Sequence, residues 1–161
     1  MWRSPLESAA TARLLCGVRS QPSVSIAVVG SVAAAATTGA LIAIGRRLGD
    51  VALPFAAIGG VVLPRAGGGA GLVLTGVVLH VAVMLLWSVL FVRLAERLAS
   101  DAVSAATIAA SHFVVSWIVA WISARGLSSA LTLGDRIAFA VVLAGALVVG
   151  MRFAFSFSRN A

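Results

Sequence analysis

The sequence predicts an all-α membrane protein with four transmembrane helices in a single domain, residues 1–161. Hydrophobic residues make up 61% of the 161-residue chain and charged residues only 11%, whereas apolar residues make up about half of a typical soluble domain. Four apolar stretches each have about the 20 residues that a helix needs to cross the hydrocarbon core. The connections between them are short, so we expect no separate catalytic domain.

The N-terminal segment is expected to lie on the membrane surface rather than to cross the membrane. Ser4 suits the N-cap of a helix, Pro5 suits its first turn, and Glu7 is placed to complete a capping box. Residues 4–19 then read as an interfacial helix with arginines available for lipid headgroups. The apolar run that follows begins too late and is too long for a cleavable signal peptide.

The first predicted span covers residues 23–45, which contain no charged residue. At a rise of about 1.5 Å per residue this segment reaches roughly 34 Å, enough to cross the bilayer. It is rich in small residues, among them Gly30, Ala34 and Thr38. Small residues let helix backbones approach closely in lipid, so we expect this helix to pack against protein on more than one side.

A short apolar segment, residues 51–64, follows the first span. It is too short to cross the membrane and is interrupted by Pro54, Gly59, Gly60 and Pro64. These features predict a short helix at the interface or a re-entrant segment.

The remaining spans are predicted at residues 72–92, 103–123 and 137–155. Thr132 and Asp135 have the spacing of a capping box just before the last span, where the helix dipole also favours an anion.

The arginine distribution predicts that both termini lie in the cytoplasm of a bacterium, with the chain in the inner (cytoplasmic) membrane. Every basic residue in the chain is an arginine, and the formal net charge is +7. This charge suits anionic lipid headgroups, whereas nucleic-acid binding would need a soluble basic face. A cytoplasmic N-terminus places seven arginines inside (Arg3, Arg13, Arg19, Arg93, Arg97, Arg152, Arg159) and five outside (Arg46, Arg47, Arg65, Arg125, Arg136).

Two histidines lie near the centres of neighbouring spans, His80 in the second and His112 in the third. In an antiparallel hairpin both imidazoles reach a similar depth and become candidates for a shared site. Three roles remain open: a hydrogen bond between helices, axial ligation of haem b or a chlorophyll-type pigment, or handling of a proton or substrate. Gly76, one turn before His80, would leave room for a flat macrocycle. The single cysteine, Cys16, forms no recognisable metal set with them.

Large side chains form stripes on the second and third spans. They predict either ordinary packing and interfacial anchoring or a surface for lipid tails, a quinone or a partner helix. The residues concerned are Met84, Trp87 and Phe91, which share the His80 face, and Phe113, Trp117 and Trp121.

The chain carries no recognisable enzyme motif, and its carboxylates fall at the ends of spans. We therefore expect a non-enzymatic accessory or structural subunit of a larger bacterial membrane complex, respiratory or photosynthetic, with lipids and other membrane subunits as partners. The alternatives are a tetrapyrrole-binding protein that uses His80 and His112, and a small transporter or channel.

The broken segment, the pattern formed by Gly76, His80 and Trp87, and the sequence HFVVSW at residues 112–117 resemble small uncharacterised bacterial four-helix inner-membrane proteins. The resemblance covers residues 23–157. It implies a helical membrane fold and no particular activity.

Overall fold

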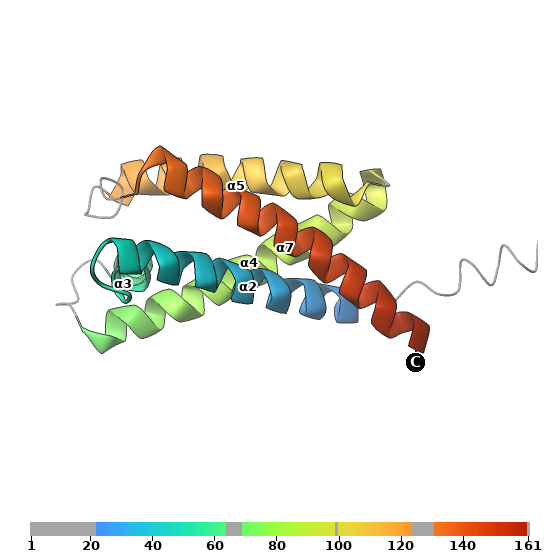
Figure 1. Ribbon diagram of the computed structural model, residues 1–161, viewed down its shortest axis with the longest axis horizontal. Helices are drawn as coiled ribbons and strands as arrows, with labels where there is room; N and C mark the ends of the chain where they lie inside the picture. The colour runs from blue at the N-terminus through green and yellow to red at the C-terminus, as the bar shows by residue number, and fades with distance from the viewer. Residues whose placement is uncertain (1–21, 64–68, 99, 124–130, 161) are drawn as a thin grey trace, which may run out of the picture.

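The computed structural model describes residues 22–63, 69–98, 100–123 and 131–160, and these residues form helices without any strand. The expected interfacial helix at residues 4–19 lies outside the described residues. Figure 1 shows four long helices and one short helix. They are α2 (Pro22–Arg47), α3 (Leu53–Val62), α4 (Ala70–Leu98), α5 (Asp101–Ser123) and α7 (Leu133–Asn160).

The four long helices confirm the predicted number of apolar segments that are long enough to span a membrane. By length and composition the candidate spans are Ser23–Arg47, Ala70–Leu98, Asp101–Val119 and Leu133–Ser156. Helix α4 continues beyond residues 72–92 at both ends, because nothing in the sequence around Arg93 and Arg97 stops a helix.

The long helices form a bundle in which α2 and α5 lie on opposite sides. Helix α2 packs against α7 and α4, and α5 packs against the same two helices. The start of α2 and the end of α7 lie at one end of the bundle, while α3 lies at the other (Figure 1). The centre of the bundle is filled by large apolar side chains that are almost completely buried, among them Val29, Met84, Phe91, Leu143 and Leu147.

Helix α3 confirms that residues 51–64 contain a short helix. Pro54 occupies its first turn, where the missing N–H costs no hydrogen bond. Ten residues span only about 15 Å, so α3 does not cross a bilayer. Its buried residues, which include Phe55 and Gly59, are those that face α4.

The contact between α3 and α4 requires glycine on both helices. A Cβ atom built at Gly59 would lie 3.1 Å from the backbone nitrogen of Gly76 and would overlap the carbonyl of Leu72. A Cβ atom built at Gly76 would overlap the carbonyl of Phe55. Because these neighbours are backbone atoms, a side chain at either glycine forces the helices apart.

The substitution Gly76→Ala tests this contact, with Gly71→Ala as the matched control on the same helix. A Cβ atom at Gly71 meets no atom within 4 Å. We expect Gly76→Ala to destabilise the protein by about 1–3 kcal/mol through overpacking. Gly71→Ala should be neutral or stabilising by up to about 1 kcal/mol. Thermal unfolding in detergent, followed by circular dichroism, measures both changes, and equal melting temperatures for the two variants would contradict the close contact.

Candidate functional site

His80 makes a buried hydrogen bond from α4 to α2. Its Nε2 atom lies 3.1 Å from the hydroxyl oxygen of Thr37. Both residues are buried, since His80 is 4% exposed and Thr37 is 0% exposed. The structure therefore gives His80 the interhelical hydrogen bond that was one of its three predicted roles.

The surroundings of Thr37 determine which histidine tautomer makes this bond. The Thr37 hydroxyl donates its hydrogen to the carbonyl oxygen of Ala33 at 2.6 Å. Its oxygen is then left to accept, so Nε2 of His80 must carry the hydrogen and donate. The carbonyl of Ala34 also faces this imidazole, and a carbonyl can only accept. His80 is thus a neutral donor committed to α2.

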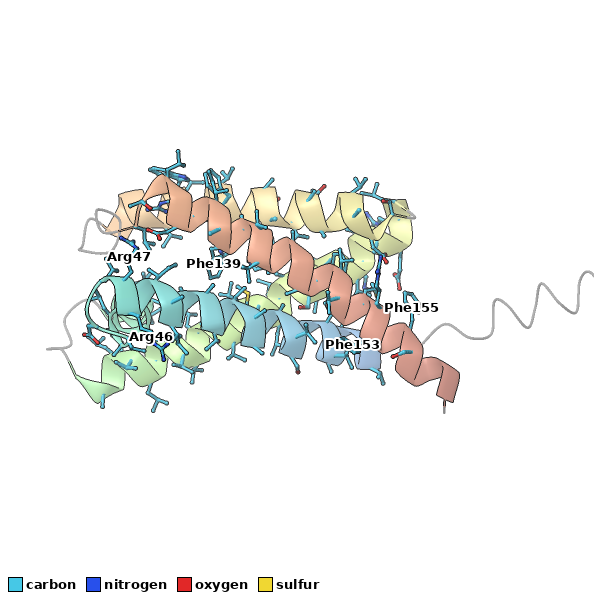
Figure 2. The ribbon with its side chains drawn as sticks, viewed as in Figure 1. Arg46, Arg47, Phe139, Phe153 and Phe155 are labelled. Carbon is cyan, nitrogen blue, oxygen red and sulfur yellow. The ribbon has the colours of Figure 1, made fainter. Side chains whose placement is uncertain are left out.

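Aromatic rings connect the two histidines. Phe139, on α7, contacts the edge of His80 at 6.4 Å between ring centroids and stacks on His112 at 5.1 Å. Phe55 packs edge-on against His80, and Trp87 packs edge-on against His112. Figure 2 shows Phe139 partway along the bundle, between the arginines at the end of α2 and the phenylalanines near the end of α7. The cluster joins α3, α4, α5 and α7.

His112 differs from His80 in its hydrogen bonding. Its Nδ1 atom is buried and has no hydrogen-bond partner among the described residues. Ser116, one turn later on the same helix, donates its hydroxyl hydrogen to the carbonyl of Phe113. A buried polar group without a partner costs about 1–3 kcal/mol. His112 is therefore the group in this cluster with unused hydrogen-bonding capacity.

Both histidines line one cavity of about 420 Å³. The cavity lies in the half of the bundle that carries α3, and every described helix contributes to its wall. Most of the wall is apolar, with Ile58, Met84 and Trp87 as examples, and the polar residues are the two histidines, Ser116, Asp135 and Arg136. A volume of about 300–1,000 Å³ with few polar groups is typical of ligand sites.

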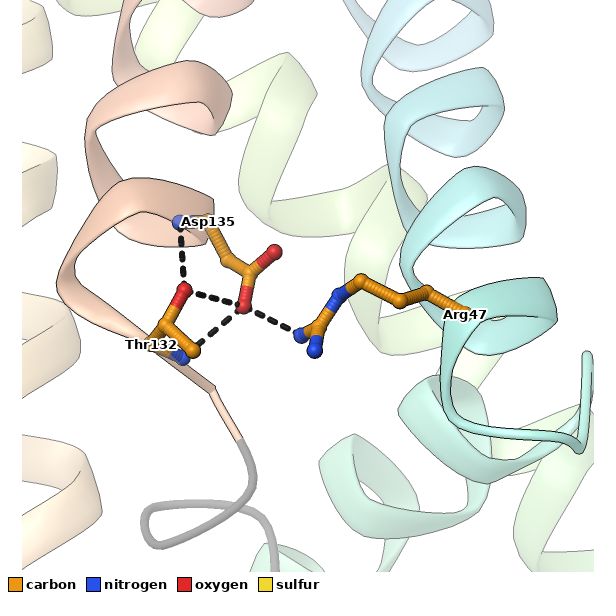
Figure 3. A network of polar contacts seen from close by, with 3 residues as sticks. All are labelled: Arg47, Thr132 and Asp135. Carbon is orange, nitrogen blue, oxygen red and sulfur yellow. Dashed lines mark hydrogen bonds and ion pairs between the residues drawn. The ribbon is translucent and has the colours of Figure 1, made fainter.

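An ionic network lies at the α3 end of this cavity. Asp135 forms the predicted capping box, since it accepts hydrogen bonds from the backbone N–H and the hydroxyl of Thr132 and its own N–H donates to that hydroxyl. The same carboxylate forms an ion pair with Arg47 of α2 (Figure 3). The network therefore joins the end of the first span to the start of the last.

Arg136 is buried beside this network although it is charged. It is 6% exposed, its guanidinium carbon lies 4.4 Å from the centre of the Trp117 ring, and its Nη1 lies 3.5 Å from the carbonyl oxygen of Ser116. It lies in the first turn of α7, with its charge held against α5.

No protein-family model, curated protein or solved structure matches this chain. The function must therefore be argued from the site alone.

The predicted stripes divide between the core and the surface. Met84 and Phe91 are buried in the core, and Trp87 is half-buried beside the cavity. Trp117 is 47% exposed and lies against Arg136, and Phe113 packs edge-on against Trp117. The side chain of Trp121 lies outside the described residues. On α2, Gly30 is buried against Leu85 of α4, while Ala34 and Thr38 are half-buried.

The space beside Gly76 is filled by the backbone of α3, so it offers no open face for a macrocycle. The His80 nitrogen that would ligate iron or magnesium already donates to Thr37, and Phe139 contacts both imidazoles. These contacts do not fit a tetrapyrrole held between His80 and His112. Among the described residues there is likewise no group of three metal-ligating side chains.

Sequence reasoning missed Thr37, Phe139 and Arg136 as site residues. Thr37 could have been found, because it is a hydroxyl at the depth of a histidine in a neighbouring span. Phe139 and Arg136 carried no such signal, since their roles depend on how α7 is rotated and where it crosses α4 and α5.

Replacing Thr37 with valine tests the buried hydrogen bond. Thr37→Val keeps the shape of the side chain but removes the acceptor of His80, so we expect a loss of about 0.6 kcal/mol, the average for such bonds in membranes, and of at most about 1.7 kcal/mol. Thr37→Ser keeps the hydroxyl and should retain most of the stability. Equilibrium unfolding in mixed micelles provides the measurement. If the valine variant is as stable as the serine variant, the hydrogen bond contributes nothing.

Proposed function

We propose that this protein is a non-enzymatic membrane protein whose cavity binds a lipophilic small molecule taken from the bilayer. The observation that carries this proposal is the cavity of about 420 Å³ between the spans, with apolar walls and few polar groups. Ligand sites in helical membrane proteins and bundles are built in this way, from side chains on facing helices.

The distribution of polarity in the cavity favours an amphipathic ligand. Asp135 and Arg136 lie at the α3 end, where α2 finishes and α7 begins, whereas the wall near Met84 and Trp87 is apolar. Leu86, Val115 and Val119 line the cavity and are also exposed on the outer faces of α4 and α5. A ligand can therefore enter sideways from lipid without crossing the charged end.

We also propose that the chain lies in a bacterial inner membrane with both termini in the cytoplasm. Four spans return the chain to the side on which it started, and the arginine count favours the cytoplasm for that side. The cavity and its ionic network then lie in the outer half of the membrane.

Filling the cavity tests the binding function. The variant Ala57→Phe places a large ring on a lining position of α3, and Val62→Phe, on an exposed position of the same helix that does not line the cavity, is the control. The probe is N-phenyl-1-naphthylamine, an apolar fluorescent amine, added to protein in lipid nanodiscs. We expect wild type and Val62→Phe to bind one molecule each and Ala57→Phe to bind at least tenfold more weakly.

The probe already partitions into lipid, so empty nanodiscs are the blank. Binding that does not differ between wild type and Ala57→Phe, when both show the same helical content and melting temperature, contradicts the proposed function.

A role as an accessory subunit is the second candidate, and one face of α2 favours it. Every fourth residue on this face is small and exposed: Ala27, Ser31, Ala35, Gly39 and Ala43. A Cβ atom at Gly39 would meet no atom within 4 Å. Such a stripe is the usual contact surface for another transmembrane helix, and we propose a span of a larger membrane complex as its partner.

The substitution Ala35→Leu tests this surface, with Val78→Leu on the exposed face of α4 as the control. A leucine in the stripe prevents close approach of another helix, so we expect the leucine at position 35 to abolish co-purification of the partner in mild detergent while probe binding persists. Wild-type protein that leaves native membranes as a monodisperse monomer would count against the subunit role.

A further inference from the structure

We infer that the cavity binds the ring of a quinone, with a carbonyl oxygen of the quinone accepting a hydrogen bond from the imidazole of His112. The inference rests on the proposed ligand-binding function and gives the chemical class of the ligand. It concerns binding alone and assigns no electron transfer to the protein.

The hydrogen bonding of the two histidines selects His112. The N–H of His80 is already committed to Thr37. His112 lines the same cavity, and its Nδ1 atom has no hydrogen-bond partner in the part of the chain that the structure describes. A neutral imidazole offers one donor and one acceptor. The Nδ1 atom is enclosed by protein, so a quinone carbonyl would accept from the N–H at Nε2, and in the other tautomer the same nitrogen would accept from the hydroxyl of the corresponding quinol.

The wall around His112 suits a flat ring. Trp87 and Phe139 contact the imidazole from two directions, edge-on and stacked, and Met84 lies on the same wall. Aromatic rings and thioether sulfur both pack favourably against another ring. A volume of about 420 Å³ is near the lower end of the roughly 300–1,000 Å³ found for ligand sites. It therefore suits one ring with the first part of a tail.

The exposed apolar side chains of the cavity wall offer the tail of such a molecule a path into the lipid. Leu86, Val115 and Val119 line the cavity and are exposed. An isoprenoid chain attached to the ring can pass between these apolar side chains into the surrounding lipid. The ring enters first and the tail remains in the bilayer.

The charges in the cavity favour a neutral head group over a fatty-acid carboxylate. The guanidinium of Arg136 is held by Ser116 and by the ring of Trp117. The carboxylate of Asp135 is paired with Arg47. Both charged groups lie at the α3 end and already have protein contacts, whereas the imidazole of His112 lies deeper along α5 and in its neutral form offers one donor and one acceptor. A quinone needs no counter-charge.

The test is binding of a decyl-substituted benzoquinone labelled with ¹³C at its carbonyl groups, measured in nanodiscs with wild-type protein and His112→Phe. Phenylalanine keeps the stacking on Phe139 but removes both nitrogens. We expect about tenfold weaker quinone binding for His112→Phe, the loss expected for one hydrogen bond, and unchanged binding of N-phenyl-1-naphthylamine. The infrared carbonyl band of bound quinone should shift to lower frequency in wild type and not in His112→Phe.

Two further variants complete the experiment. His112→Gln supplies an amide donor and should restore part of the quinone affinity and of the infrared shift. Val78→Phe adds a ring on the exposed face of α4, away from the cavity, and should change neither.

The outcomes separate this inference from the proposed function. Quinone binding that does not depend on His112, or quinone that fails to displace the naphthylamine probe, overturns the inference while ligand binding stands. Displacement of the probe by palmitate but not by quinone also overturns it, and sensitivity of that displacement to Arg136→Gln would identify a fatty-acid site. A wild-type protein that binds neither the probe nor quinone removes the proposed function as well.

Discussion

The close backbone contact between α3 and α4 is the constraint on which the site depends. In lipid, apolar surface gains little by moving from hydrocarbon to protein, so helices associate through close packing and hydrogen bonds. Gly59 and Gly76 allow α3 to lie directly on α4. This contact brings Phe55 to the edge of His80 and makes Ala57 and Ile58 part of the cavity wall. A helix too short to cross the bilayer thus becomes the end wall of a space formed by four longer helices.

The two histidines line the same cavity but differ in their hydrogen bonding. His80 donates to Thr37 and fixes α4 against α2, which is the ordinary use of a buried polar group in a membrane protein. His112 stacks on Phe139 but leaves Nδ1 without a partner among the residues described. This difference in hydrogen bonding distinguishes the two histidines, and it is the basis on which His112 rather than His80 is proposed to bind a ligand.

Periodicity and length were sufficient to predict the helices and some of their ends. The four apolar segments, the short helix around Pro54 and the capping box of Thr132 and Asp135 all follow from local rules, because each depends on residues close together in sequence. That His80 and His112 lie near each other was also predictable, and both line the same cavity. The pairing of His80 with Thr37, the position of Phe139 between the imidazoles and the burial of Arg136 were not. These depend on helix rotation and crossing, which a single sequence does not determine. Gly76 was expected to leave room for a macrocycle, and in the structure the backbone of α3 lies against it.

The packing of α2 against α7 has a consequence for how the protein is made. These helices are the first and last of the four spans, and the ion pair between Arg47 and Asp135 joins residues 88 positions apart. A ribosome delivers the chain from its N-terminus, so α2 is synthesised well before its main neighbour. Until α7 arrives, the small-residue faces of α2 lack that neighbour, and the cavity lacks the wall that carries Phe139. The cavity is therefore completed only at the end of translation, and a truncated chain that lacks α7 cannot form it.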